Sequence, residues 1–167
     1  MAVAEIIGAV IGVMLLLLVA YMLVGSVLTT AEVVTTAQKD TTLLNEAQMR
    51  TSINLDSISC SGINPTNCTI SVINNGNEII SDFNHMDILT TTGSGTDGFQ
   101  YITYNTNNNE CGIEKTWCTL TITPDTIHPN ELDPNEIMSM RVTIPGTQPI
   151  WFQVTTGNGV NAQKTYP

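Results

Sequence analysis

The sequence predicts an α+β fold, in which a long N-terminal hydrophobic α-helix is followed by an antiparallel β-sandwich. Two observations predict it. The stretch from Ile6 to Leu28 carries no charged side chain, and its only polar ones are Tyr21 and Ser26. After Arg50 the sequence changes to short runs with a period of two, separated by Asn-, Gly- and Pro-rich turns. We expect residues 1–50 to form the helix and residues 51–167 to form one β-domain.

The apolar part of the helix is long enough to cross a membrane. About 20 apolar residues span the hydrocarbon core of a bilayer, and the stretch from Ile6 to Leu28 supplies that number. From Ala31 to Arg50 the pattern becomes amphipathic, with charged residues between apolar or small residues spaced by three or four. Because no proline precedes Pro65, we expect one unbroken helix on the order of 75 Å long, at about 1.5 Å per residue.

Small residues and one carboxylate mark the start of this helix. Ala4, Gly8 and Gly12 are spaced by four and therefore share one face, on which another helix backbone can approach closely. Glu5 lies at the edge of the apolar stretch, where an ionised group is costly without a partner. We expect helices of several copies to pack together, with Glu5 neutralised by the α-amino group of a neighbouring Met1, which would fix the axial register.

Seven strands are expected in the β-domain, at Ile53–Cys60, Thr69–Ile73, Met86–Thr90, Phe99–Tyr104, Trp117–Thr123, Ile137–Ile144 and Ile150–Thr155. A turn is expected at Asn74–Asn77, because Asn and Gly tolerate positive φ. The stretches 91–98 and 105–110 are polar hairpin tips. The aromatic residues on strands are expected in the core, namely Phe99, Trp117, Trp151 and Phe152.

The four cysteines favour disulfides. Cys60, Cys68, Cys111 and Cys118 all follow the helix and form two short-range pairs in sequence. An even number of cysteines in a domain of secreted type favours disulfides over a metal site. Three pairings are open, and we favour Cys60–Cys68 with Cys111–Cys118 because each would bracket a short turn. The alternative is zinc, but the spacings do not match paired C-x2-C ligands.

Charge and motifs exclude several functions. The formal net charge of -10, with five basic against 15 acidic residues, disfavours nucleic acid and anionic headgroups as partners. The chain has no G-x-S-x-G, H-E-x-x-H, P-loop or G-x-G-x-x-G motif, and Gly93-Ser94-Gly95 lacks the flanking strand and helix of a phosphate site. We therefore expect no enzyme, no cofactor and no small-molecule substrate, and a secreted enzyme ranks third among the functions considered.

Three further groups of residues are candidate sites. The acidic stretch from Asp125 to Glu136 lacks the ligand order of a calcium loop and is interrupted by two prolines, so we interpret it as a turn with solvated charges. His85 and His128 are isolated in sequence, and no neighbouring residue suggests a catalytic triad. Asn67-Cys68-Thr69 is the one N-glycosylation sequon, which makes Asn67 a candidate for glycosylation.

The N-terminal sequence from Met1 to Val10, with an acid at position five and a long apolar helix, resembles the mature N-terminus of type IV pilin-like proteins. In that superfamily a peptidase removes a short basic leader, which would explain why no Lys or Arg precedes the apolar stretch; a true start at Met1 is the alternative. The β-rich remainder, with turns at Asn74–Gly76 and Pro134–Glu136, looks more like the archaeal branch. There the resemblance implies an immunoglobulin-like sandwich, as in archaellins and archaeal adhesion pilins.

The resemblance and the residues together predict a subunit of an extracellular helical filament, of the pilus or archaellum kind. The precursor would lie in the cytoplasmic membrane, and the homopolymer would form when the apolar helix is extracted and buried among like helices. Glu5 favours a pilin, since archaellins commonly lack an acid at that position. The alternative is a single-pass membrane protein with an envelope-binding domain, such as an archaellum stator component, because accessory archaellum proteins share this arrangement.

Overall fold

A computed structural model describes residues 2–92, 98–107 and 111–166. Two features expected from the sequence, Gly93-Ser94-Gly95 and the end of the 105–110 tip, lie outside the described residues. The chain divides into two compact units, residues 1–44 and residues 45–167. The first unit contains most of the helix. The second contains the last turns of the helix together with all of the strands.

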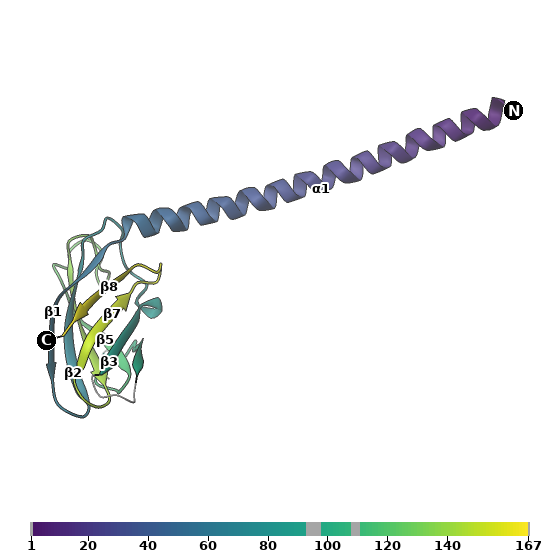
Figure 1. Ribbon diagram of the computed structural model, residues 1–167. Helices are drawn as coiled ribbons and strands as arrows, with labels where there is room; N and C mark the ends of the chain where they lie inside the picture. The colour runs from purple at the N-terminus through teal and green to yellow at the C-terminus, as the bar shows by residue number, and fades with distance from the viewer. Residues whose placement is uncertain (1, 93–97, 108–110, 167) are drawn as a thin grey trace. The chain divides into compact units, whose positions relative to one another are not determined.

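The helix α1 runs from Ala2 to Arg50 without interruption (Figure 1). Its 49 residues at about 1.5 Å per residue give a length of roughly 74 Å, as the absence of proline predicts. Glu5 lies in its first turn and Arg50 in its last, so each charge is complementary to the partial charge of the helix end near it. The expected single helix is confirmed.

The described part of the β-domain contains eight strands and one short 3-10 helix. They are β1 (Ile53–Ser61), β2 (Thr66–Asn74), η1 (Phe83–His85), β3 (Asp87–Thr92), β4 (Phe99–Tyr104), β5 (Thr116–Thr123), β6 (Ile137–Ile144), β7 (Pro149–Thr155) and β8 (Asn161–Thr165). Each of the seven expected strands is present. The strand β8 and the helix η1 were not predicted.

The strands form one sheet in the order β1-β2-β6-β5-β4-β3-β7-β8. All neighbours are antiparallel except β4 and β5, which are parallel and share only the register pairs Thr103↔Thr116 and Tyr104↔Trp117. The β-domain is therefore two four-stranded antiparallel halves joined by one short parallel pair. The expected α+β class is confirmed, whereas the two sheets expected to be separate are continuous through β4 and β5.

The two outer strands nearly close the sheet into a barrel (Figure 1). The Lys164 Nζ on β8 donates to the backbone oxygen of Leu55 at 3.2 Å and also to that of Asp56, both on β1. Side-chain bonds of this kind protect strand edges that have no ladder partner. Both halves of the sheet contribute to one core, whose largest fully buried side chains include Trp117, Phe152, Ile70, Ile88, Ile102, Leu132 and Met140.

Two of the four aromatic residues expected in the core are not buried there. Trp117 and Phe152 are almost completely buried, but Phe99 is 70% exposed and Trp151 is partly exposed. Successive side chains of a strand point to opposite faces, and Ile102 of β4 is fully buried, so Phe99 belongs to the outer face. The rings of Phe99 and Trp151 pack edge to face there, with centroids 6.1 Å apart. The core prediction for Phe99 was wrong because it ignored this alternation.

Candidate functional site: the apolar helix

The apolar surface of α1 extends around the whole helix. Every large apolar side chain from Ile6 to Leu28 is more than half exposed. A helix that is apolar on one stripe can be covered by one neighbour, but a helix that is apolar all round needs apolar surroundings on every side. By its length and composition, this helix could cross a membrane.

The small residues near the N-terminus leave space on one helix face. A Cβ atom added at Gly8 or Gly12 would meet no atom within 4 Å. Glu5 is exposed one turn before Gly8. Met1 and the side chain of Ala4 lie outside the described part of the structure. The packing face at Ala4, Gly8 and Gly12 and the neutralisation of Glu5 by Met1 of another copy therefore stay predictions.

Threonine pairs follow the apolar stretch. The hydroxyls of Thr29, Thr30, Thr35, Thr36, Thr41 and Thr42 each donate to the carbonyl oxygen four residues earlier, at 2.8 to 3.0 Å. A hydroxyl bonded within its own helix carries little of the cost that an unpaired polar group has in apolar surroundings. These threonines are therefore compatible with an apolar environment. The charged side chains of Glu32, Lys39 and Asp40 limit how far along the helix such an environment can extend. The paired spacing was a sequence signal that the prediction did not use.

The last turn of α1 is bonded to the loop between β7 and β8. The Asn158 Nδ2 donates to the Thr51 Oγ1 at 2.6 Å, and the Gln48 Nε2 donates to the Asn158 backbone oxygen at 2.6 Å. The Thr51 Oγ1 in turn donates to the backbone oxygen of Ala47 at 2.8 Å. One asparagine therefore holds the end of the helix to the β-domain, 107 residues away from Thr51 in sequence. No local pattern in the sequence indicates this contact.

The turn at Asn74–Asn77 also holds the chain where the helix ends. The backbone N–H groups of Asn75 and Asn77 donate to the oxygens of Ser52 and Arg50, each at 2.8 Å. A Cβ atom at Gly76 would lie 2.5 Å from the Arg50 oxygen and 2.5 Å from the Ser52 nitrogen. The turn is present as expected, but for a different reason: glycine is needed for this close approach, and none of these turn residues has positive φ.

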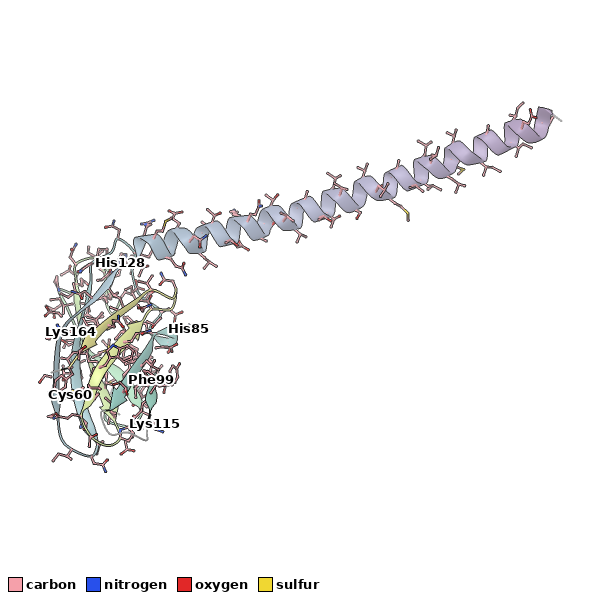
Figure 2. All side chains as sticks on the ribbon, viewed as in Figure 1. Cys60, His85, Phe99, Lys115, His128 and Lys164 are labelled. Atoms are coloured by element: carbon pink, nitrogen blue, oxygen red, sulfur yellow. A yellow bond between two sulfur atoms is a disulfide. The ribbon has the colours of Figure 1, made fainter. Side chains whose placement is uncertain are left out.

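Both expected disulfides are present. Cys60, labelled in Figure 2, lies directly opposite Cys68 in the ladder of β1 and β2, and the disulfide joins the two. The second disulfide joins Cys111, before β5, to Cys118 within β5. All four cysteines are bonded, so none offers a thiolate to zinc.

The sequon residue Asn67 lies inside a strand. It is partly buried on β2, and its Oδ1 accepts a hydrogen bond from the Thr143 hydroxyl at 2.9 Å. Its neighbour Cys68 is fully buried in a disulfide. Glycosylation at Asn67 stays a prediction, and the Oδ1 contact leaves the Nδ2, the atom that accepts the sugar, unengaged by Thr143.

The acidic residues before β6 hold their own loop together. The Asp133 Oδ2 accepts from the His128 backbone nitrogen at 3.0 Å, and the Oδ1 contacts the His128 Nδ1 at 2.8 Å. The Glu136 carboxylate accepts from the Asp133 backbone nitrogen at 3.0 Å. The hydrogen bond to Asp133 raises the pKa of His128 above 6.5, aided by the charges of Glu131 and Glu136.

Neither histidine is isolated in the fold, contrary to the sequence interpretation. His85 contacts the Asp82 Oδ2 at 2.6 Å through its Nδ1, as His128 contacts Asp133. The acids were overlooked because they lie three and five residues away in irregular chain rather than in a known motif. Within the described residues, no group of three or more His, Cys, Asp or Glu side chains could hold a metal ion.

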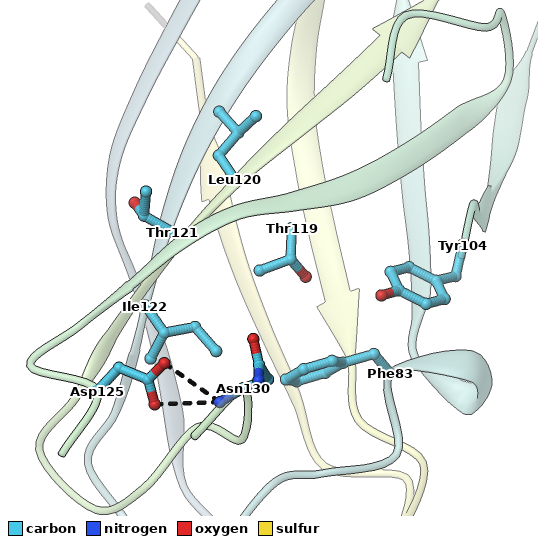
Figure 3. Close-up of a pocket in the computed structure, with 8 residues that line it drawn as sticks. All are labelled: Phe83, Tyr104, Thr119, Leu120, Thr121, Ile122, Asp125 and Asn130. Atoms are coloured by element: carbon cyan, nitrogen blue, oxygen red, sulfur yellow. Dashed lines mark hydrogen bonds between the residues drawn. The ribbon is translucent and has the colours of Figure 1, made fainter. Parts of the chain in front are cut away.

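A small hollow lies where β5 extends past the end of β4 (Figure 3). It has a volume of about 320 Å³ and is lined by Phe83, Tyr104, Ile122, Asp125, Asn130 and three residues of β5, Thr119–Thr121. Both Asp125 carboxylate oxygens accept from the Asn130 backbone nitrogen, at 3.1 and 3.2 Å. The aspartate therefore closes a loop, and the lining described here offers no paired acid and base for catalysis.

Comparison with known proteins finds a distant likeness in fold. No family model and no curated protein matches the chain. Among solved structures, the chain is similar to the archaellum periplasmic stator protein FlaG from Sulfolobus acidocaldarius, with 14% identity and a TM-score of 0.48, over 70% of this chain and 99% of that one. It is also similar to the FlaF and FlaG stator complex of the same organism, with 15% identity and a TM-score of 0.48, over 68% of this chain and 87% of that one. A likeness this remote assigns neither a family nor a function.

Proposed function

We propose that the protein is a single-pass membrane protein of the cell surface, anchored by α1, with its β-domain on the outer side of the cytoplasmic membrane. The finer role that we propose is an envelope-binding component, such as an archaellum stator protein. In the general role and in the finer one alike, the apolar helix lies in lipid and the β-domain is free to contact other envelope molecules.

The observation that carries the proposal is the apolar surface of α1 from Ile6 to Leu28. It surrounds the helix completely, and lipid can satisfy such a surface on every side without a second protein chain. The threonines that follow are bonded within the helix, and the first charged residue after the stretch is Glu32. This order fits a helix that leaves the hydrocarbon core near Leu28 and enters the polar interface.

The two disulfides support an outer location for the β-domain. Disulfides form and persist in oxidising compartments and are rare in the cytoplasm. Both join residues of the β-domain, and no cysteine of the chain is left free. The whole chain has a net charge of -10, and of its five basic residues only Lys115, Arg141 and Lys164 follow the helix, so we expect the domain to have no polybasic surface for anionic headgroups.

Thiol labelling in whole cells tests this topology. Because the native cysteines are bonded to each other, single cysteines introduced at Ser52 and Leu17 would be the reactive thiols. With a membrane-impermeant maleimide, we expect S52C to be labelled in intact cells and L17C only after detergent is added. Labelling of S52C only after cell lysis would place the β-domain in the cytoplasm and refute the proposal.

A filament subunit is the second candidate. The observation that favours it is the open face at Gly8 and Gly12 next to Glu5, which would allow copies of the helix to pack closely. In this role, E5A would abolish filaments while the chain stays in the membrane, and E5Q would serve as the control of similar size. Filaments of normal yield from E5A would argue against the role of Glu5, and filaments absent from sheared wild-type cells would argue against this candidate.

A further inference from the structure

The strand β4 has one edge that is only partly paired. Along Phe99–Ile102 it pairs with β3 on one side, whereas on the other side it pairs with β5 only at Thr103 and Tyr104. The remaining edge, beside Phe99 and Tyr101, has no partner strand among the described residues. Unpaired strand edges present backbone donors and acceptors in a regular row.

The hydrogen bonds of β4 show which backbone groups face this open edge. The Thr103 nitrogen donates to the Lys115 oxygen at 3.1 Å, and the Asn105 nitrogen donates to the Trp117 oxygen at 2.8 Å. In a strand, alternate residues direct their N–H and C=O groups to the same side. The N–H and C=O groups of Tyr101 and Phe99 therefore face the open side, and those of Gln100 and Ile102 face β3.

The edge of β4 stays open because the residues just before β5 do not continue alongside β4. Lys115, just before β5, has a φ of +60°, and its nitrogen donates to the Thr143 oxygen on β6 at 2.9 Å. The segment before it is tied to β5 by the disulfide between Cys111 and Cys118. Within the described residues, no strand occupies the position that an N-terminal extension of β5 would take beside Phe99 and Tyr101.

A cavity of about 690 Å³ lies at this position, within the usual size range of ligand sites. It is lined by Phe99–Tyr101 from β4, by Glu114 and Lys115 before β5, by Pro145–Gly146 after β6 and by Asn64 before β2. Phe99 and Lys115 lie near each other at one end of the β-domain (Figure 2). The cavity is bordered by strand residues on the β4 side and by loop residues on the others, so it lies beside the open edge of β4.

A buried acceptor in the lining lacks a donor. The Oε1 atom of Gln100 is inaccessible to solvent and has no hydrogen-bond partner among the described residues. Gln100 as a whole is partly buried, and its Oε1 atom has no accessible surface toward the cavity, so a bound segment would reach this oxygen only after a change of side-chain rotamer.

The open edge of β4 at Phe99 and Tyr101, together with the cavity beside it, is called the slot below. We propose that the slot binds an extended peptide segment of a partner protein, which adds as a strand to β4 on the side where β5 does not pair with it. Tyr101 donates and accepts main-chain hydrogen bonds with the segment. On the outer face, the ring of Phe99 packs on Trp151 of β7 and the hydroxyl of Tyr101 donates to Asp87 of β3, so both side chains are engaged on the β3 side. The open edge therefore offers the segment main-chain groups rather than an apolar surface. The inference concerns the β-domain alone and does not depend on how α1 is anchored.

A tethered strand tests the proposal without an identified partner. The full chain in detergent is extended at its C-terminus by a Gly-Ser linker of about ten residues and the probe Thr-Val-Thr-Val-Thr, since a linker of this length holds the probe at roughly millimolar effective concentration. The control carries Pro-Pro-Pro-Pro-Pro, which has no backbone N–H donor in any register and whose φ is held at about −65°, so it cannot form a ladder with β4. Amide hydrogen exchange is measured at Tyr101, with Ile102, already paired with β3, as the internal reference.

We expect exchange at Tyr101 to slow about tenfold or more with the valine probe and to stay unchanged with the proline control. Equal exchange with both probes would overturn the proposal. Protection of Tyr101 in the unextended chain by a saccharide such as maltose, but not by the valine probe, would also overturn it and would make the slot a carbohydrate site.

Discussion

Replacing Gly76 by alanine tests the contact between the turn at Asn74–Asn77 and the residues at and just after the end of α1, Arg50 and Ser52. The new Cβ would lie 2.5 Å from two backbone atoms, the Arg50 oxygen and the Ser52 nitrogen, and neither can move as a side-chain end would. The turn must therefore shift, and the hydrogen bonds from Asn75 and Asn77 lengthen or break. Overpacking typically costs about 1–3 kcal/mol, and each lost hydrogen bond about 1 kcal/mol.

We therefore expect G76A to lower the free energy of unfolding of the β-domain by about 2–4 kcal/mol. For a domain of this size, that corresponds to a decrease in Tm of roughly 10 °C. The assay is thermal unfolding of the full chain in detergent, followed by the fluorescence of tryptophan, since Trp117 is buried in the core and reports on the β-domain. N75A is the matched control, because it removes an exposed side chain from the same turn and keeps the backbone donor. A Tm for G76A within about 2 °C of the N75A value would refute the argument from close approach.

Three further predictions follow from the structure. A single L17R change should leave the protein in the membrane fraction, whereas L16R combined with L18R should release a large part of it, because each arginine at the helix centre costs about 2.5–3.5 kcal/mol of insertion free energy; membrane flotation measures both. The pKa of His128 is raised in the folded state, so its bond to Asp133 should stabilise the domain fully below pH 6.5. This stabilisation should be lost as the pH rises through the raised pKa. The difference in Tm between wild type and H128N should therefore be larger at about pH 5 than at about pH 9. The double variant C60S/C68S should lower the free energy of unfolding by about 2–3 kcal/mol, as expected for loss of a disulfide that closes a short loop, with denaturant unfolding as the measurement.

Local patterns were sufficient to predict most of the fold. The bounds of β4 and β6 agree with the expected Phe99–Tyr104 and Ile137–Ile144, because both strands combine β-branched or aromatic residues with clear flanking turns. The helix was predictable from the lack of proline and from its apolar composition. The strand β8 was missed because Asn161–Thr165 has no apolar alternation; it is an outer strand, and β7 is its one partner among the described strands.

Features that depend on distant residues could not be predicted in this way. The bond between Asn158 and Thr51 joins loops that are far apart in sequence, and the close approach at Gly76 depends on the path of the chain after the helix. The parallel pair of β4 and β5 likewise depends on chain path, since sequence alternation does not specify which strands become neighbours. The slot beside Tyr101 is a consequence of that pairing, and for this reason no motif in the sequence marked it.

The most direct test of the anchor is fractionation of cells after shearing, followed by extraction of the membranes with alkaline carbonate. If lipid surrounds the stretch from Ile6 to Leu28, the wild-type protein stays in the membrane pellet through both steps, and electron microscopy of the sheared medium shows no filaments that contain it. Recovery of most of the protein from the medium as sedimentable filaments would contradict the anchor and would assign the apolar helix to a polymer core.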